Sequence, residues 1–216
     1  MFNCSFKGRY DTASASATNV AAGTLTLSAG DLMLRASMSD AIFSTGPSFS
    51  DLSFSVEKPG AFSIDYDLSE KDFEFQFMNT VNVLEKPLHL AYTHAKGKNR
   101  TFLDGTLVLS GVNKVLASYA LDSGNCKLKY TRVRGPTTFE PSYDTAIKSW
   151  DLAVSQKFWD DCVLKASYKT SSKVLGLDWT MKGKPSGAYK ISASLNLLEG
   201  LQVPKLTAES TWNFDM

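Results

Sequence analysis

The sequence lacks any run of about 18 apolar residues, which excludes a transmembrane helix. Among its 216 residues are only three cysteines, Cys4, Cys126 and Cys162, an odd number without the spacing of a metal site. A disulfide framework is therefore not expected, and a reducing compartment is the simpler setting. The two histidines, His89 and His94, would lie on opposite faces of a strand, which argues against a shared metal ion.

Motifs of known chemistry are also missing. The sequence contains no P-loop, no dinucleotide-binding glycine fingerprint, no Gly-x-Ser-x-Gly and no paired metal-binding cysteines, so we expect neither an enzyme nor a cofactor. The formal net charge is +1 and the pI is about 7.6, without the basic footprint of a nucleic-acid partner. The first patterned segment begins at Phe2, which is expected to leave no room for a cleaved leader peptide.

What the sequence does contain is strict alternation of apolar and polar side chains. Residues 71–83 place Phe73, Phe75 and Phe77 on one face of a strand, with Glu74 and Gln76 on the other. Residues 62–68 repeat the pattern. A helix would scatter these side chains around its surface, so the period of two predicts β-strands.

The same alternation runs through the whole chain and predicts an all-β fold. We count about 14 to 16 candidate strands, with about 12 still possible, and no helical stretch. Residues 137–147 give the weakest strand, because Pro141 would remove a ladder hydrogen bond. No shift in composition marks a boundary, so residues 1–216 are expected to form a single β-barrel channel domain.

The connections between strands suggest two different rims. The longer ones, at 11–19, 40–50, 95–100 and 198–204, fall on one side of the predicted sheet, whereas 30–31, 58–60, 110–113 and 134–136 are short turns on the other. This asymmetry is typical of outer-membrane-type barrels. The turns at 122–125 and 182–187 are expected to depart from the rule.

Alternation alone does not say which face meets water. One alternative is a soluble β-sandwich or lipocalin-like cup with its apolar face inward, which would bind an apolar ligand. The other is a transmembrane antiparallel up-and-down β-barrel with the apolar face toward lipid. The strand number, the strand length and the aromatic residues near strand ends favour the membrane barrel. These aromatic residues are Tyr10, Tyr66, Tyr92, Tyr119, Tyr168, Trp179 and Trp212.

In the barrel interpretation, the charged residues of the polar face are the candidate pore-lining residues. They are Lys7, Arg9, Arg35, Glu57, Asp65, Asp67, Glu74, Asp104, Lys114, Lys127, Lys129, Lys165, Lys169, Asp178, Lys182, Lys190, Lys205 and Glu209. Both signs occur, so neither anions nor cations should be strongly excluded. The signs are segregated into an acidic wall and basic walls, and basic walls suit phosphorylated or carboxylated solutes. The acidic wall is Asp65, Asp67 and Glu74; the basic walls are Lys114, Lys127 and Lys129, then Lys165, Lys169, Lys182 and Lys190.

Several blocks resemble the plant 24-kDa outer envelope pore proteins of plastids, and together they span nearly the whole chain. The blocks are Arg35–Asp40, Val56–Gly60, Lys71–Val81, Asn99–Leu109, Ser123–Tyr130, Thr137–Pro141 and Ala208–Met216. The resemblance implies a multi-pass β-barrel in the plastid outer envelope membrane (chloroplast or etioplast), surrounded by membrane lipid. It also implies a high-conductance, voltage-dependent, weakly selective channel.

The solutes that the resemblance implies are triose and hexose phosphates, sugars, phosphate, ATP, dicarboxylates and charged amino acids. The family supplies no catalytic or gating residue for this chain, so the pore-lining residues rest on alternation alone. Both a monomeric and a self-associating homo-oligomeric barrel stay open.

Overall fold

The alternating segments form strands in the computed structural model, which describes residues 2–11, 20–38, 52–159, 161–183, 187–198 and 204–215. In these ranges there are 16 strands and no helix. The strands are β1 (Phe2–Asp11), β2 (Val20–Ala29), β3 (Leu32–Met38), β4 (Leu52–Lys58), β5 (Phe62–Asp67), β6 (Asp72–Val83), β7 (Lys86–Ala95), β8 (Arg100–Ser110), β9 (Asn113–Ala120), β10 (Cys126–Arg134), β11 (Thr137–Asp144), β12 (Ser149–Trp159), β13 (Cys162–Lys169), β14 (Val174–Gly183), β15 (Gly187–Asn196) and β16 (Lys205–Asp215).

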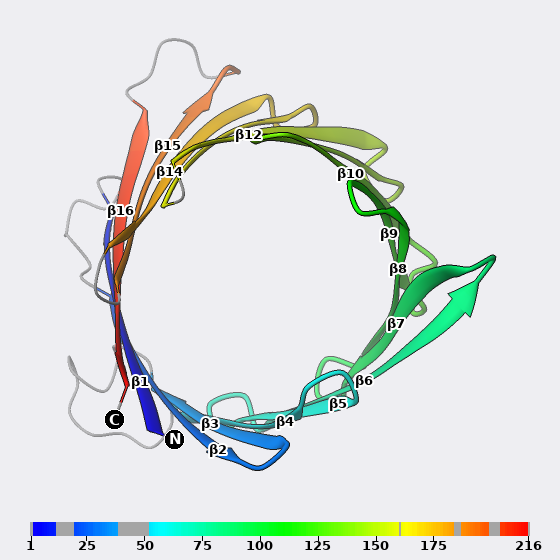
Figure 1. Cartoon of the computed structure of the whole chain (residues 1–216), viewed down its shortest axis with the longest axis vertical. Coiled ribbons are helices and arrows are strands. Elements are labelled where there is room, and N and C mark those ends of the chain that lie inside the picture. Colours follow the sequence, from blue (N-terminus) through cyan, green and yellow to red (C-terminus); the bar gives the residue numbers. More distant parts are fainter. Residues whose placement is uncertain are drawn as a thin grey trace.

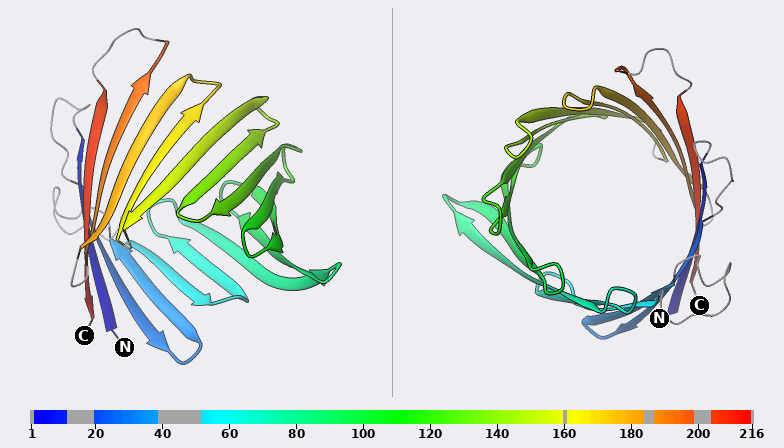
Figure 2. Two further views of the ribbon diagram at one scale, coloured as in Figure 1. Left: turned by 45° about the horizontal axis from the view of Figure 1, so that its top comes forward. Right: turned by 180° about the vertical axis from the view of Figure 1, so that it is seen from behind.

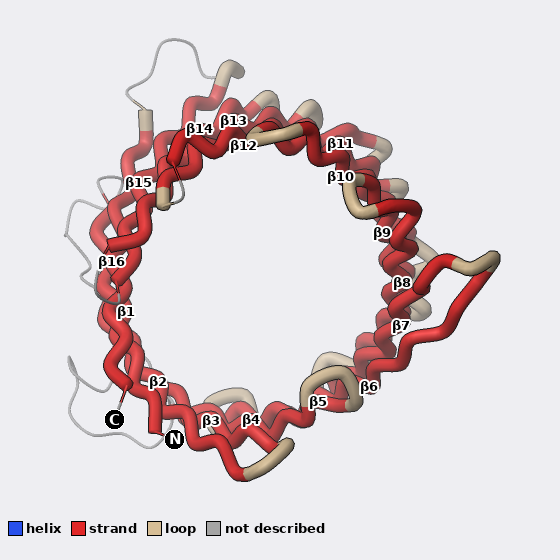
Figure 3. Tube along the Cα trace, viewed as in Figure 1, coloured by secondary structure: helices blue, strands red, loops and turns tan. Residues whose placement is uncertain are grey.

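Each strand pairs with its neighbours in sequence, and β1 pairs with β16, so the sheet closes into one barrel (Figures 1 and 3). All pairs are antiparallel, and the closing pair runs from Asn3 opposite Asp215 to Asp11 opposite Thr207. The prediction of an antiparallel up-and-down barrel of about 14 to 16 strands is confirmed. Because the sheet closes on itself, the two-sheet sandwich among the alternatives is wrong.

The two rims of the barrel differ in the length of their connections. Both ends of the chain lie at one rim (Figure 2), where the described turns at 30–31, 59–61, 84–85, 111–112 and 135–136 are two or three residues long. Among the described connections, those of four or five residues, at 68–71, 96–99, 121–125, 145–148 and 170–173, lie at the opposite rim. The expectation that the turn at 122–125 departs from the rule was therefore wrong, and the centre of the turn at 182–187 lies outside the described residues. The predicted loops at 11–19, 40–50 and 198–204 lie largely outside the described residues.

Pro141 lies within β11, so the weakest predicted segment is a genuine strand. On the β12 side Pro141 pairs with Leu152. On the β10 side the paired residues of β11 end at Phe139 and begin again at Ser142. Pro141 therefore has no partner residue on that side. Proline has no N–H group to donate, and the ladder is interrupted on one side while the strand continues.

The barrel has almost no apolar core in the described residues, where the buried hydrophobic residues are Ala95 and Cys162 alone. Large apolar side chains are instead exposed, among them Phe54, Trp150 and Ile191. A contiguous exposed apolar surface of this kind marks an interaction with a membrane or with another protein. Within the described ranges we find no helix with the length and apolar character needed to cross a membrane.

Candidate functional site

The strand register places all the charged residues predicted from the sequence on one face of the sheet, which we call the polar face. Directly opposed residues in an antiparallel pair share a face, and so do alternate residues along a strand. Lys165 opposes Asp178, and Lys190 opposes Glu209. Asp65 opposes Glu74 in the same way. Following these pairs around the barrel joins the residues from Lys7 to Glu209 into one continuous surface.

The other face, here called the apolar face, carries most of the exposed large hydrophobic side chains. At the long-loop rim it holds aromatic pairs: Tyr66 stacks on Phe73 with ring centroids 4.3 Å apart, and Tyr143 contacts Trp150 at 5.1 Å. Aromatic residues at the edge of an apolar band are characteristic of membrane–water interfaces. The predicted aromatic residues also lie on this face, although Trp179 sits near the middle of β14 rather than at a strand end.

An acidic sector occupies the polar face of β4 to β6. It comprises Glu57, Asp65, Asp67, Asp72 and Glu74. Arg35 of β3 lies beside it, with its guanidinium 3.6 Å from the Glu57 carboxylate. A pocket of about 300 Å³ lies over this sector, lined by acidic side chains, by serines of β3 and β4, and by Arg35 and Lys98.

A basic sector runs from β9 to β16, and acids lie between its lysines. Glu140 of β11 contacts Lys129 of β10 at 2.5 Å and Lys165 of β13 at 3.6 Å. Lys127 lies 3.9 Å from Asp151 of β12. The predicted basic walls are therefore interrupted by the carboxylates of Glu140 and Asp151. Alternation places both residues on the polar face, but they are not among the predicted pore-lining residues.

The closing seam between β1 and β16 has its own ion pairs. The Glu209 carboxylate of β16 lies 3.1 Å from the Lys7 ammonium and 3.8 Å from the Arg9 guanidinium. Lys7 and Arg9 both belong to β1. Beside the seam, Lys190 of β15 lies 3.7 Å from Asp178 of β14. In the described part of the chain, Lys114, Lys169, Lys182 and Lys205 make no ion pair. Of these four, Lys169 lies directly opposite Asp151 in the strand register.

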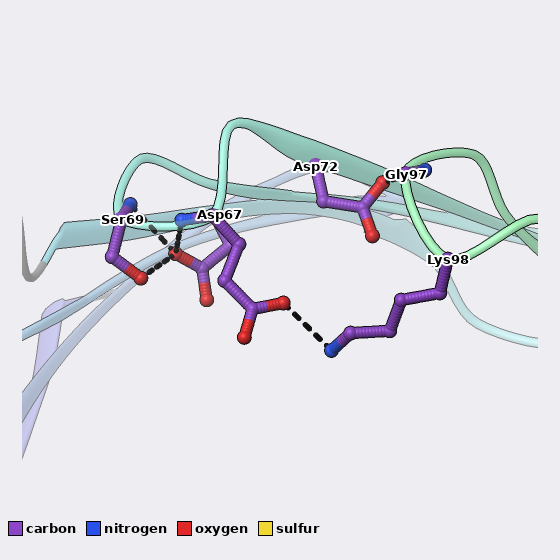
Figure 4. A network of polar contacts seen from close by, with 6 residues as sticks. Asp67, Ser69, Asp72, Gly97 and Lys98 are labelled. Carbon is purple, nitrogen blue, oxygen red and sulfur yellow. Dashed lines mark hydrogen bonds and ion pairs between the residues drawn. The ribbon is translucent and has the colours of Figure 1, made fainter.

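Two neighbouring loops at the long-loop rim carry a polar network beside the acidic sector (Figure 4). The Asp67 carboxylate accepts hydrogen bonds from the Ser69 N–H at 2.8 Å and the Ser69 hydroxyl at 2.6 Å. The Gly97 N–H donates to Asp72. Lys98 bonds to Glu70 at 2.7 Å, which joins the β7–β8 loop to the β5–β6 loop.

The histidines and cysteines take separate positions, as their spacing predicts. His89 bonds to Thr80 at 2.8 Å on the polar face, whereas His94 bonds to Thr101 at 2.9 Å on the apolar face. Cys126 and Cys162 are free thiols, and the side chain of Cys4 lies outside the described set. Among the described residues, no group of three His, Cys, Asp or Glu side chains could hold a metal ion.

Solved structures with the same architecture are bacterial porins and related outer membrane proteins. A mutant of the Rh. blastica porin aligns with a TM-score of 0.60 at 10% identity, covering 99% of this chain and 100% of that one. The Acinetobacter baumannii outer membrane protein Omp33 aligns with a TM-score of 0.55 at 13% identity, over 99% and 97% of the two chains. The fold is therefore that of a porin-like β-barrel.

The sequence comparison gives the particular family. Residues 2–215 match the family described as outer envelope pore protein 24, and the chain belongs to that family. It is 48% identical over 213 residues to the chloroplastic outer envelope pore protein 24B of Arabidopsis thaliana, covering 98% of each chain. It is 42% identical to the chloroplastic outer envelope pore protein 24 of Oryza sativa subsp. indica, over 97% of this chain and 98% of that one. The predicted family and the plastid outer envelope localisation are confirmed.

Proposed function

We propose that the chain is a passive solute channel of the plastid outer envelope whose polar face lines the aqueous lumen. In this proposal residues 1–216 act as one channel domain, and the apolar face meets lipid. The observation that carries it is the continuity of the polar face: every charged residue predicted to line the pore shares one side of a closed barrel of 16 strands. Barrels of this size enclose a water-filled channel.

The ion pairs of the basic sector support an inward polar face. Lys165 of β13 reaches Glu140 of β11 at 3.6 Å although β12 lies between the two strands. Residue Ala153 of β12, which opposes Glu140, has a small side chain that leaves room for this contact. Side chains converge on the concave side of a curved sheet and diverge on the convex side. Contacts that skip a strand therefore favour the concave side for these charges.

The exposed apolar face supports the complementary half of the proposal. Phe77 is 56% exposed, Trp150 51% and Phe54 47%. Transfer of such side chains out of water contributes about 25 cal/mol per Å², so a barrel with this surface gains stability from a bilayer. A lipocalin-like cup would hold these side chains inside, around its ligand.

The charges of the polar face favour small charged solutes. The lysines of the basic sector suit phosphate, sugar phosphates, ATP and dicarboxylates, and the acidic sector suits cationic groups such as those of charged amino acids. Because the lumen carries both a basic and an acidic sector, we expect only a weak preference between anions and cations overall. High conductance follows from a wide lumen, and voltage dependence from charges that the membrane field can act on.

Planar-bilayer recording of the purified protein in a salt gradient tests this function. We expect channel openings with a reversal potential close to zero. Phosphorylated solutes added to one side should reduce or block the single-channel current. An absence of conductance in a correctly folded preparation would overturn the proposal.

Solubility separates the channel from the soluble cup. The barrel is expected to need detergent or lipid to remain monodisperse. A chain that stays monodisperse in aqueous buffer without detergent would exclude a lipid-facing apolar surface and would favour the cup that binds an apolar ligand.

A further inference from the structure

Lys98 belongs to a loop, but it lines the pocket of the acidic sector. It lies in the β7–β8 connection, between Ala95 and Arg100. Its ammonium bonds to Glu70 of the β5–β6 loop at 2.7 Å. The same pocket of about 300 Å³ is lined by Lys98, by Arg35 of β3 and by Asp65 of β5. A cation from a neighbouring loop therefore lies against the acidic polar face (Figure 4).

Both loops that carry this contact are fixed by carboxylates at strand ends. Asp67 at the end of β5 accepts the N–H groups of Ser69 and Glu70, which orders the loop that presents Glu70. Asp72 at the start of β6 accepts the N–H of Gly97, the residue before Lys98. The N–H of Lys96 also donates to the Phe73 carbonyl at 2.9 Å. The position of Lys98 is thus set by the acidic sector that it faces.

The charge on Lys98 is permanent at physiological pH. The hydrogen bond and the negative charge of Glu70 raise the pKa of Lys98 above its ordinary value, with a further contribution from Asp72. Lys98 is half-exposed, so its field reaches the adjacent solution over a Debye length, which is about 10 Å at 0.1 M salt.

We propose that Lys98 is a selectivity-determining residue, a tethered counter-charge that lowers the preference of the acidic sector for cations at the long-loop mouth of the pore. This inference rests on the proposed channel function. Without the ammonium, the carboxylates of β5, β6 and the β5–β6 loop would present their full negative potential to entering ions. With it, cations are attracted less and anions are repelled less.

Charge-neutralising variants at two lysines of the same loop test the proposal. Lys98→Gln is expected to raise the cation-over-anion permeability ratio about two-fold, because a unit charge acts across several ångströms of water. Lys98→Arg should restore the wild-type ratio. Lys96→Gln removes the same formal charge from the same loop, but Lys96 does not line the pocket, so its ratio should stay near that of the wild type.

A variant at Gly97 moves the charge of Lys98 without removing it. A Cβ atom at Gly97 would lie 2.7 Å from Cγ of Asp72, closer than real contacts allow. Gly97→Ala should therefore break the contact that positions the loop and shift the permeability ratio toward cations, by less than Lys98→Gln does. An unchanged ratio in Gly97→Ala would overturn the positioning by Asp72.

Ionic strength supplies a readout that a merely structural role of Lys98 would not reproduce. The effect of Lys98→Gln should shrink strongly between 0.1 M and 1 M salt, because the Debye length falls to about 3 Å. If Lys98→Gln and Lys96→Gln behave alike at low salt, the role of Lys98 is refuted while the channel stands. If no variant and no wild-type preparation conducts, it is the channel function that fails.

Discussion

Lys165 on β13 and Glu140 on β11 form an ion pair at 3.6 Å across the intervening strand β12. Glu140 also holds Lys129 of β10 at 2.5 Å, so one carboxylate offsets two ammonium groups. Its side chain is only 17% exposed. Glu140 is therefore a counter-charge within the basic sector, as Asp151 and Asp178 are. We propose that Lys98 acts in the same way for the acidic sector.

Replacing Glu140 should make the channel more selective for anions. Glu140→Gln leaves Lys129 and Lys165 without their carboxylate, and we expect the anion-over-cation permeability ratio to rise about two-fold at 0.1 M salt. Reversal potentials in a salt gradient measure the change. Glu85→Gln, an exposed acid in the β6–β7 turn, is the matched control. Equal shifts in both variants would show that overall charge, not position, sets selectivity.

Adjacent residues of β10 test the assignment of the two faces. Leu128 lies on the apolar face opposite Tyr143, and Lys127 on the polar face opposite Asp144. Leu128→Arg should lower membrane insertion, because an arginine facing lipid costs about 2–4 kcal/mol at the midplane and about 0–1 kcal/mol near the interface. Leu128 is the third residue of β10, toward the long-loop rim, so the cost should lie below the midplane figure. Lys127→Glu should insert normally and shift selectivity toward cations. Protease protection in liposomes measures insertion for both.

The outcome that contradicts this assignment is the reverse pattern. If Lys127→Glu blocked insertion while Leu128→Arg inserted like the wild type, the polar face would have to meet lipid and the assignment of the two faces would be reversed.

The closing seam should be weakened by loss of Glu209. Its carboxylate bonds to Lys7 at 3.1 Å and lies near Arg9, both on the first strand. We expect Glu209→Gln to lower the free energy of unfolding by about 0.5–1 kcal/mol, in the range of partly exposed ion pairs. Thermal unfolding in detergent, followed by gel mobility, measures the effect.

Glu70→Gln is the stability control for the seam, because it breaks an exposed loop ion pair instead. The side chains of Lys98 and Glu70 are 56% and 50% exposed, and such pairs contribute little to stability. The unfolding temperature of this control should match the wild type. If Glu209→Gln unfolded at the same temperature as the control, the seam ion pairs would not stabilise closure.

The sequence predicts much of this barrel because alternation is a local property. The strands around Phe73 and the shared face of the charged residues follow from a period of two. The closed barrel was favoured over a sandwich by the strand number, the strand length and the aromatic residues as well. The strand with Pro141 was hard to predict, because only the tertiary ladder shows that its missing N–H falls on one side.

The ion pairs could not be predicted, because they depend on the stagger between strands. Nothing local to Glu140 indicates that Lys165, two strands further along, lies within 3.6 Å of it. Nothing in the basic loop at 96–100 indicates a partner in another loop. The contact of Lys98 with Glu70 arises only when two loops meet at one rim. The pairings on which we propose that selectivity depends are therefore not contained in a sequence pattern.

The central claim is that the polar face lines a water-filled pore, and two adjacent small residues of β9 test it most directly. Ser118 opposes Lys127 on the polar face, and Ala117 opposes Leu128 on the apolar face. In a cysteine-free background, Ser118→Cys and Ala117→Cys are each reconstituted in planar bilayers and treated with a charged, membrane-impermeant thiol reagent. We predict that conductance falls in Ser118→Cys and is unchanged in Ala117→Cys. A fall in Ala117→Cys alone would contradict the account.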